Sequence, residues 1–276
     1  MAEESVQTLL PDDESKQSYE IFNHGAVVVF RAALSSKEQQ ELMADTLKKL
    51  TVHKDMNCVK LGTAKSPLQG VEWRTGWRLS ADANFPPKMS STATTIATTD
   101  VAKVTEEKFP KCLEVAGRLY NKWRNDPEQQ KIIGVHNSKI TNPHLIYPPS
   151  FVAHSIWCRF YEPDHLLGWH QDPTNCSWTL LINCGRAADL SFSRGAPRGQ
   201  VATITYITEK DLEKDEDGKI YTVSLRSGDA VFFNGSVLFH AITKIHDEST
   251  QPAWWPSKEA YVRVGIQMRA YWAGNT

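Results

Sequence analysis

The sequence predicts an α+β protein that is mainly β, with a double-stranded β-helix (jelly-roll, cupin-like) core and N-terminal helices packed on it. From about residue 151 the apolar pattern has a period of two, and short strands alternate with turns without a long helix between them. The preceding half contains two stretches with helical spacing. At 276 residues and 41% hydrophobic, the chain has enough apolar material for a large core.

The N-terminal half is expected to carry the helices. Residues 1–17 are polar and acidic, and we expect them to be disordered. The extension that follows spans residues 18–150 and begins with a buried strand at 25–30. Ser35-Ser-Lys-Glu38 is a capping box that opens a helix ending at about Leu50. A second helix is expected over residues 106–124, before the breaking sequence Asn-Asp-Pro.

Residues 51–100 lose regular periodicity, and we interpret them as a nucleotide-recognition lid. Two tryptophans and two arginines occur within six residues, in Trp73-Arg-Thr-Gly-Trp77-Arg78. Nucleobases stack on aromatic rings while arginines hold phosphates, so this mixture suits a nucleic-acid surface. An ordinary hairpin whose tryptophans cover the core explains the same residues, and both interpretations stay open here.

The region 151–276 is the predicted catalytic core. Its expected strands span residues 155–162, 170–172, 178–184, 190–193, 201–207, 220–225, 230–233 and 262–270. An acidic insertion at 209–218 separates two of them, and we expect it to be a solvated hairpin tip rather than a metal site.

Composition limits the classes of function. A net charge of −1 argues against a protein that coats nucleic acid by bulk charge, although a local basic patch stays possible. Five cysteines without a C-x-x-C pair predict reduced thiols and an intracellular location, with nucleus and cytoplasm undecided. The acidic N-terminus lacks the apolar stretch of a signal peptide, and no apolar run is long enough to span a membrane.

Three residues have the pattern of a metal site. His170 and Asp172 are two apart, so in a strand their side chains lie on one face and reach one ion together. His240 follows about 70 residues later and must come from another strand. Two imidazoles and one carboxylate are the facial triad that binds non-haem Fe(II), with positions left open for a bidentate oxo-acid and O2.

The last strand has two arginines on its inner face. Arg263 and Arg269 share that face with Gly265 and Gln267, while the alternate residues are apolar. Buried arginines are costly unless each meets an anion, and the planar guanidinium pairs bidentately with carboxylate. The two arms, pointing toward each other, are expected to hold a small dicarboxylate between them.

The motifs together resemble the AlkB-type Fe(II)/2-oxoglutarate dioxygenases. The resemblance lies in Trp169-His-Gln-Asp172, in Phe239-His240-Ala-Ile and in Arg263-x-Gly-x-Gln-x-Arg269, and covers roughly residues 20–272. It implies an enzyme that uses Fe(II), 2-oxoglutarate and O2, with the triad as iron ligands.

The resemblance also implies roles for residues outside the triad. Arg263 would bind the distal carboxylate of 2-oxoglutarate, Arg269 would lie near its iron-chelating end, and Tyr161 would contact it as well. The implied substrate-binding residues are Trp77, Arg78 and Thr174. The chain departs from the family pattern at Arg159, Gly265 and Gln267, where the family has Asn, Asn and Thr, and at Thr174, where repair members often have Asp.

The implied activity is oxidative demethylation of a methylated nucleobase in DNA or RNA, by hydroxylation of an N-methyl group and release of formaldehyde. The nucleic-acid partner would present a single-stranded or flipped base, and Arg194 and Arg198 in a later loop add to the basic residues of the lid. The alternative is a hydroxylase or demethylase of a protein or small molecule on the same scaffold, favoured by the near-neutral charge and Thr174. A non-catalytic jelly-roll binding module is a third hypothesis. Nothing in the sequence indicates a membrane or a protein partner.

Overall fold

The computed structural model describes the strands and helices of the fold and a few residues between them. These are residues 19–22, 27–52, 73–78, 109–138, 147, 151, 153–163, 165–172, 178–193, 205–207, 212, 220–256 and 261–270. The N-terminal segment 1–17, residues 53–72 and 79–100 of the lid, and the insertion 209–218 other than the buried Leu212 lie outside the described residues.

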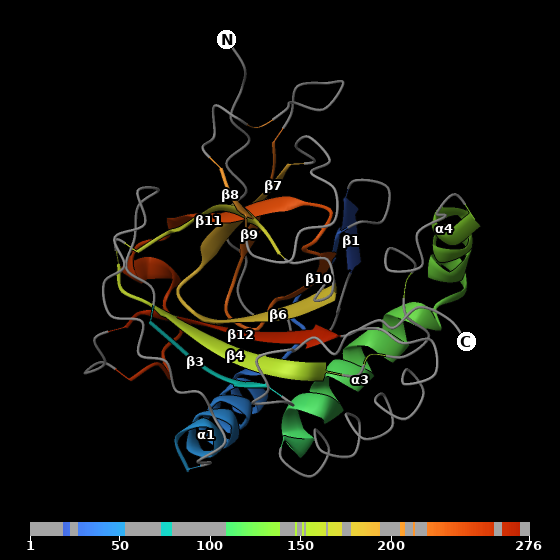
Figure 1. The fold of residues 1–276 in the computed structure, drawn as a ribbon. Helices are drawn as coiled ribbons and strands as arrows, with labels where there is room; N and C mark the ends of the chain where they lie inside the picture. The colour runs from blue at the N-terminus through green and yellow to red at the C-terminus, as the bar shows by residue number, and fades with distance from the viewer. Residues whose placement is uncertain are drawn as a thin grey trace.

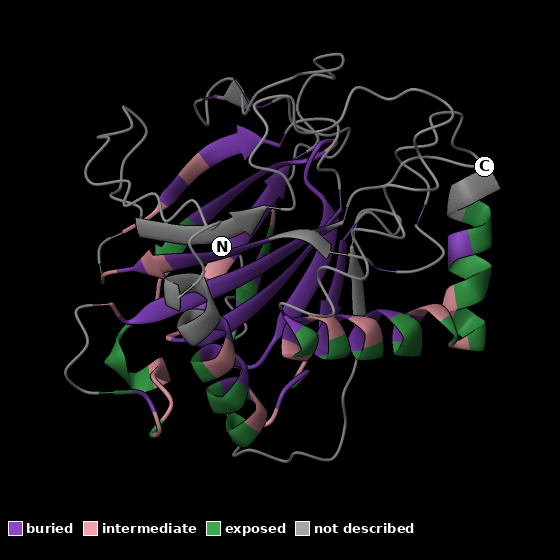
Figure 2. Cartoon of the chain, turned by 60° about the horizontal axis from the view of Figure 1, so that its bottom comes forward, coloured by how far each residue is buried: buried purple, intermediate pink, exposed green. Residues whose placement is uncertain are grey.

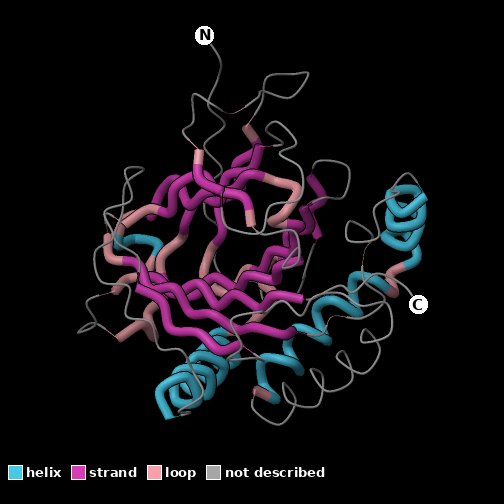
Figure 3. The backbone as a smooth tube through the Cα atoms, in the orientation of Figure 1, coloured by secondary structure: helices cyan, strands magenta, loops and turns pink. Residues whose placement is uncertain are grey.

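Two antiparallel sheets pack face to face (Figures 1 and 3). The larger sheet contains β1 (Tyr19–Phe22), β2 (Val27–Phe30), β3 (Trp73–Arg78), β4 (Ala153–Tyr161), β6 (Trp178–Gly185), β10 (Ala230–Asn234) and β12 (Arg263–Ala270). The smaller contains β5 (Leu167–Gln171), β7 (Ala188–Ser193), β8 (Thr205–Tyr206), β9 (Tyr221–Leu225) and β11 (Phe239–Ile245). Their orders are β1-β2-β10-β6-β12-β4-β3 and β8-β5-β11-β7-β9. This arrangement confirms the predicted mainly β jelly roll.

β12 is an interior strand of the larger sheet, next to its central strand β6, and fixes which side chains enter the space between the sheets. It pairs with β6 on one side and β4 on the other, in continuous register from Arg263 to Arg269. Because side chains alternate along a strand, Val264, Ile266 and Met268 join the core under the helices. The arginines of β12 face the other way, as the sequence predicted, and both are buried.

Helices α1 (Ser36–Val52) and α3 (Pro110–Arg124) cover the outer face of the larger sheet, with their buried faces toward it (Figures 1 and 2). The predicted capping box forms: Glu38 Oε2 accepts from Ser35 N at 2.9 Å, and Ser35 Oγ accepts from Glu38 N at 3.3 Å. α3 begins at Pro110, later than expected, because Phe109 at the N-cap has non-helical backbone angles. Proline at the first helical position loses no hydrogen bond.

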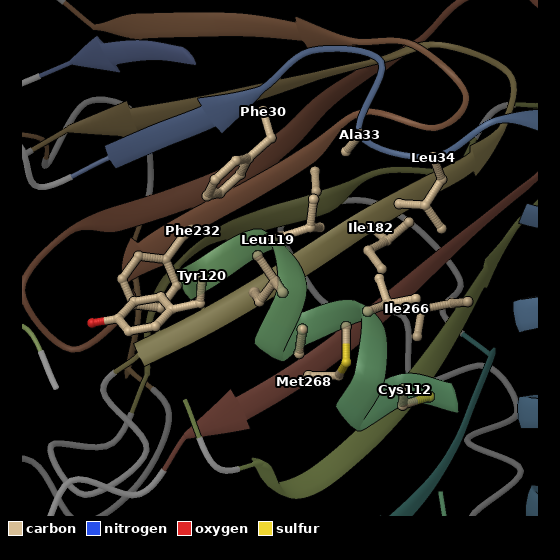
Figure 4. Close-up of a cluster of buried hydrophobic side chains, with 14 of the residues drawn as sticks. Phe30, Ala33, Leu34, Cys112, Leu119, Tyr120, Ile182, Phe232, Ile266 and Met268 are labelled. Carbon is tan, nitrogen blue, oxygen red and sulfur yellow. The ribbon is translucent and has the colours of Figure 1, made fainter. Parts of the chain in front are cut away.

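The core between helices and sheet is rich in aromatic residues (Figure 4). Phe232 of β10 stacks on Trp178 with ring centroids 4.8 Å apart, and Tyr120 of α3 meets the Phe232 ring edge-on at 4.9 Å. A second core lies between the sheets and joins residues such as Val231 and Phe192. The candidate site lies on the side of the larger sheet that faces this second core. The first core packs on the opposite side of the same sheet and supports it.

Several elements were not predicted. α4 (Pro127–Ser138) follows α3 directly where a loop was expected, and stands to one side of the sheets in Figure 1. β1 and β3 are edge strands of the larger sheet, so the N-terminal half contributes strands as well as helices. His240 lies in β11, so it comes from a second strand as expected, although the bounds of that strand were not predicted. Among the described residues, no helix is long and apolar enough to cross a membrane.

Candidate active site

The three predicted metal ligands meet on two neighbouring strands of the smaller sheet. β5 and β11 pair antiparallel, with His170 and His240 directly opposite each other. Asp172 immediately follows β5 and reaches the same space as His170. One ligand atom from each residue lies within 4.8 Å of the other two, and the imidazole centroids are 4.1 Å apart. All three side chains are buried, so the group is a preformed site.

Each imidazole is oriented by the backbone two residues earlier in its own strand. His170 Nδ1 lies 2.8 Å from the carbonyl oxygen of Gly168, and His240 Nδ1 lies 3.1 Å from that of Leu238. Because a carbonyl oxygen only accepts, this network assigns the proton to Nδ1 of both rings. The lone pair is therefore on Nε2, and the two Nε2 atoms are available as metal ligands.

The Asp172 carboxylate is held from one side. Arg269 of β12 donates to Oδ1 at 2.7 Å, whereas Oδ2 has no hydrogen-bond partner and lies 3.8 Å from His240 Nε2. The backbone N–H of Asp172 donates to the carbonyl of Gly235 at 2.8 Å. A fully buried carboxylate oxygen without a donor fits a site built for a cation.

The electrostatics of the group favour metal binding at neutral pH. Burial lowers the pKa of His170 well below its usual value, and the adjacent His240 lowers it further. Burial also lowers the pKa of His240, although Asp172 opposes this. Burial alone would raise the pKa of the Asp172 carboxyl, but the neighbouring positive charges, that of Arg269 above all, outweigh it and the pKa is lowered. The site thus presents neutral imidazoles and a carboxylate, the protonation states that bind a metal.

Arg263 lies at the opposite end of the inner face of β12 from Arg269. Its Nε donates to Asn183 Oδ1 at 2.5 Å, and its guanidinium stacks over the ring of Tyr161 at 4.4 Å. Both Nη atoms are buried without a hydrogen-bond partner. A buried guanidinium whose two Nη groups lack hydrogen-bond partners is costly unless an anion meets them, so this end of the site fits a carboxylate.

The two arginines differ in their partners. Arg269 pairs with Asp172, and its Nε is buried without a hydrogen-bond partner, as are both Nη atoms of Arg263. The predicted binding of one dicarboxylate between the two arginines stays a prediction. Arg269 lies at the metal end and Arg263 at the far end.

Some residues of the site were missed by sequence reasoning. Asn183 holds Arg263 from β6, and the carbonyl of Gly235 accepts the backbone N–H of Asp172 at a position where an added Cβ would overlap the carboxylate. The sequence marks Arg159 only as a departure from the family pattern, yet it is buried on the same strand face as Tyr161, opposite Gly265 in the register. Its charge lowers the pKa of the buried His170 and His240. The alternation of β4 was the available signal for Arg159; nothing in the sequence pointed to Asn183.

The predicted substrate residues are only partly described. Trp77 and Arg78 belong to β3, which pairs with β4 at the edge of the larger sheet, with Trp77 opposite Ile156. The side chains of both lie outside the described residues, as does Thr174. Their part in binding stays a prediction.

Comparison with known families identifies the class. A family model of the 2OG-Fe(II) oxygenase superfamily matches residues 26–269, a span that contains the triad and both site arginines. The chain therefore belongs to the 2OG-Fe(II) oxygenase superfamily. It is an Fe(II)- and 2-oxoglutarate-dependent oxygenase.

Solved structures show more distant likenesses. OsALKBH1 is 15% identical, with a TM-score of 0.48, over 92% of this chain and 100% of that chain. The epimerase SnoN from nogalamycin biosynthesis is 14% identical, with a TM-score of 0.42, over 88% and 78% of the two chains. A 2OG-Fe(II) oxygenase family oxidoreductase from Burkholderia pseudomallei is 11% identical, with a TM-score of 0.40, over 91% and 89%. A search of curated proteins found no match. These likenesses do not identify a substrate.

Proposed function

We propose that this oxygenase demethylates a methylated nucleobase in DNA or RNA. With Fe(II), 2-oxoglutarate and O2 bound, such a site oxidises a substrate C–H to C–OH and converts 2-oxoglutarate to succinate and CO2. One oxygen atom of O2 enters the substrate and the other enters succinate. The N–CH2OH product then breaks its C–N bond, releasing formaldehyde and the N–H of the base.

In this proposal the chain's own residues bind and orient the reactants. The two free Nη atoms of Arg263 hold the distal carboxylate of 2-oxoglutarate, with Tyr161 packed under the guanidinium. Arg269 fixes Asp172 at the metal end. Because His170, Asp172 and His240 are buried, a base in a duplex cannot reach them, and the substrate must be single-stranded or flipped out.

The composition and position of β3 are the main support for a nucleic-acid substrate. Two tryptophans and two arginines fall in its six residues, and it pairs directly with β4, the strand that carries Arg159 and Tyr161. In this register Trp73 and Trp77 are opposite Phe160 and Ile156, which pack in the core under the helices, whereas Arg74 is opposite Arg159. The arginines of β3 therefore fall on the face of the sheet that carries Arg159 and Tyr161, where they suit a substrate with phosphates. This supports a nucleic-acid substrate over a free small molecule.

A protein or small-molecule substrate on the same scaffold is the second candidate. The net charge of −1 provides no bulk attraction for a polyanion. Thr174 also replaces the acidic residue that the repair enzymes of the AlkB type often use to contact the base. Both observations favour a substrate other than an alkylated base in DNA.

The test measures succinate and formaldehyde released by the iron-loaded protein with 2-oxoglutarate. Methylated and unmethylated single-stranded and bubbled oligonucleotides of DNA and RNA are compared, with a reaction without oligonucleotide as control. We expect formaldehyde in proportion to succinate with one methylated base, and loss of that base's methyl group. Succinate without formaldehyde from any oligonucleotide would contradict the nucleic-acid proposal and favour the second candidate.

A further inference from the structure

Gly235 lies against the metal-binding carboxylate. It occupies the turn between β10 and β11, and its carbonyl accepts the backbone N–H of Asp172 at 2.8 Å. A Cβ atom built on Gly235 would overlap Oδ2 of Asp172 and would be 3.1 Å from its Cγ. Oδ2 is the oxygen without a hydrogen-bond partner. The missing side chain of Gly235 therefore leaves space for the atom that is available to bind the metal.

The backbone conformation does not explain this glycine. Among the described residues, the glycines with positive φ are Gly185 and Gly228, and Gly235 is not one of them. Alanine can adopt the backbone angles of Gly235 without the strain that a left-handed conformation would impose. Space beside Asp172 is the property that an added methyl group would remove.

Asp172 cannot move away without leaving the site. Its side chain is fully buried, and Arg269 holds Oδ1 at 2.7 Å. Oδ2 lies 3.8 Å from Nε2 of His240. A methyl group on residue 235 would push Oδ2 from its present position beside the imidazole, because the other oxygen is pinned by the guanidinium.

The turn is also held in place. Ser236 N and Oγ donate to Asn234 Oδ1 at 3.1 and 2.8 Å, and Gln171 Nε2 donates to the Ser236 carbonyl at 2.5 Å. One end of the turn continues β10 in the larger sheet, and the other leads into β11, which carries His240. The turn therefore cannot retreat from Asp172 without disturbing a second metal ligand.

We propose that Gly235 is a positioning residue for the metal site, which keeps Oδ2 of Asp172 directed to the ion. Gly235→Ala is expected to weaken metal binding about 10- to 100-fold, the usual effect of changing a residue that supports a metal ligand. The absorption spectrum of the Co(II)-substituted protein is expected to change as well, because the carboxylate no longer binds in the same geometry.

The experiment titrates the metal-free protein with Co(II), and with Fe(II) under anaerobic conditions. Gly117→Ala is the matched control, since a Cβ on Gly117 of α3 would meet nothing within 4 Å, and it should keep wild-type affinity and spectrum. Wild-type affinity and spectrum in folded Gly235→Ala would overturn the proposal. An equal loss in Gly117→Ala would also overturn it, because the effect would then not be local.

A double-mutant cycle covers the case in which Gly235→Ala folds poorly. The free energy of unfolding of the metal-free protein is compared for Gly235→Ala in the wild-type and in the Asp172→Ala backgrounds. If the methyl group clashes with the carboxylate, the destabilisation should largely disappear when the carboxylate is removed. The same destabilisation in both backgrounds would place the clash elsewhere and overturn the proposal.

Discussion

Arg263 and Arg269 are both buried on one face of β12, but their surroundings differ. Arg269 Nη2 pairs with the carboxylate of Asp172 at 2.7 Å. Arg263 is held through Nε by Asn183 and keeps both Nη atoms without a partner. The same residue type therefore stabilises a metal ligand at one position and is available to bind an external anion at the other. Substitutions at the two positions should have separable effects.

Replacing Arg263 with Lys should weaken 2-oxoglutarate binding while leaving metal binding unchanged. Lysine keeps the charge but loses the planar pair of N–H groups. Hydrogen bonds to charged groups contribute about 1.5–3 kcal/mol, so the 2-oxoglutarate concentration for half-maximal succinate formation should rise about ten- to hundredfold. Arg118→Lys is a control, because Arg118 forms an exposed ion pair with Glu38. Unchanged 2-oxoglutarate dependence in Arg263→Lys would show that this guanidinium does not bind the cosubstrate.

Arg269→Gln should make metal binding more sensitive to acid. The guanidinium is the main influence that lowers the pKa of the Asp172 carboxyl against the effect of burial. A carboxylate with a lowered pKa stays ionised until the pH falls through that value, so removing the charge raises the pH at which Asp172 becomes protonated. Co(II) affinity should be measured from neutral to acidic pH. As the pH is lowered, the affinity should begin to fall at a higher pH in the variant than in the wild type. Identical pH profiles in both proteins would contradict this role.

At the scale of elements, the start of α1 depends on two reciprocal hydrogen bonds. Ser35→Ala removes the acceptor of Glu38 N and should destabilise the protein by about 1 kcal/mol in urea unfolding. Ser36→Ala is the control, because Ser36 is exposed at the first helical position. Equal stability of the two variants would contradict a contribution from the cap.

The same cap has an expected pH dependence. Burial acts to raise the pKa of Glu38, but the hydrogen bonds from Ser35 and the charge of Arg118 outweigh it, and the pKa is lowered. The ionised cap therefore stabilises the protein above the unfolded-state pKa of Glu38, and this contribution is lost as the pH falls through the folded-state value. The stability difference between wild type and Ser35→Ala should shrink in acid.

The missed helix α4 shows a limit of local signals. The sequence Asn125-Asp126-Pro127 predicts only the end of α3. Asp126 also caps the next helix, because its Oδ1 accepts from the backbone N–H groups of Glu128 and Gln129 at 2.9 and 3.2 Å. Pro127 then occupies the first position of α4. One short sequence can end one helix and begin another, and its composition does not distinguish the two cases.

Edge strands were harder to predict than central ones. The buried strands β6 and β10 were predicted nearly to their bounds because each is a short, largely apolar run. β3 consists of Trp-Arg-Thr-Gly-Trp-Arg, a mixture that suits a lid, a hairpin or an edge strand equally. Its pairing with β4 brings together residues about 80 positions apart, which no short pattern reveals.

For the whole molecule, the site is a product of the two sheets facing each other. The smaller sheet supplies the histidines and Asp172, while the larger supplies Arg263, Arg269 and Tyr161. The sequence predicted His170 and Asp172 from their spacing in a strand and the two arginines from the alternation of β12, whereas Tyr161 came from the family resemblance. It could not predict the contacts that orient them, since Arg269 and Asp172 are 97 residues apart and Arg263 and Asn183 are 80 apart.

The most direct test of this account combines metal binding and turnover in His170→Ala. Wild-type protein should bind Fe(II) in equimolar amount, gain thermal stability from it because the ion binds only the folded state, and convert 2-oxoglutarate to succinate. His170→Ala should lose iron binding, the stabilisation by metal and succinate formation together, while its metal-free form still unfolds cooperatively. Succinate formation retained in His170→Ala at the wild-type rate would contradict the assignment of the triad as the iron site.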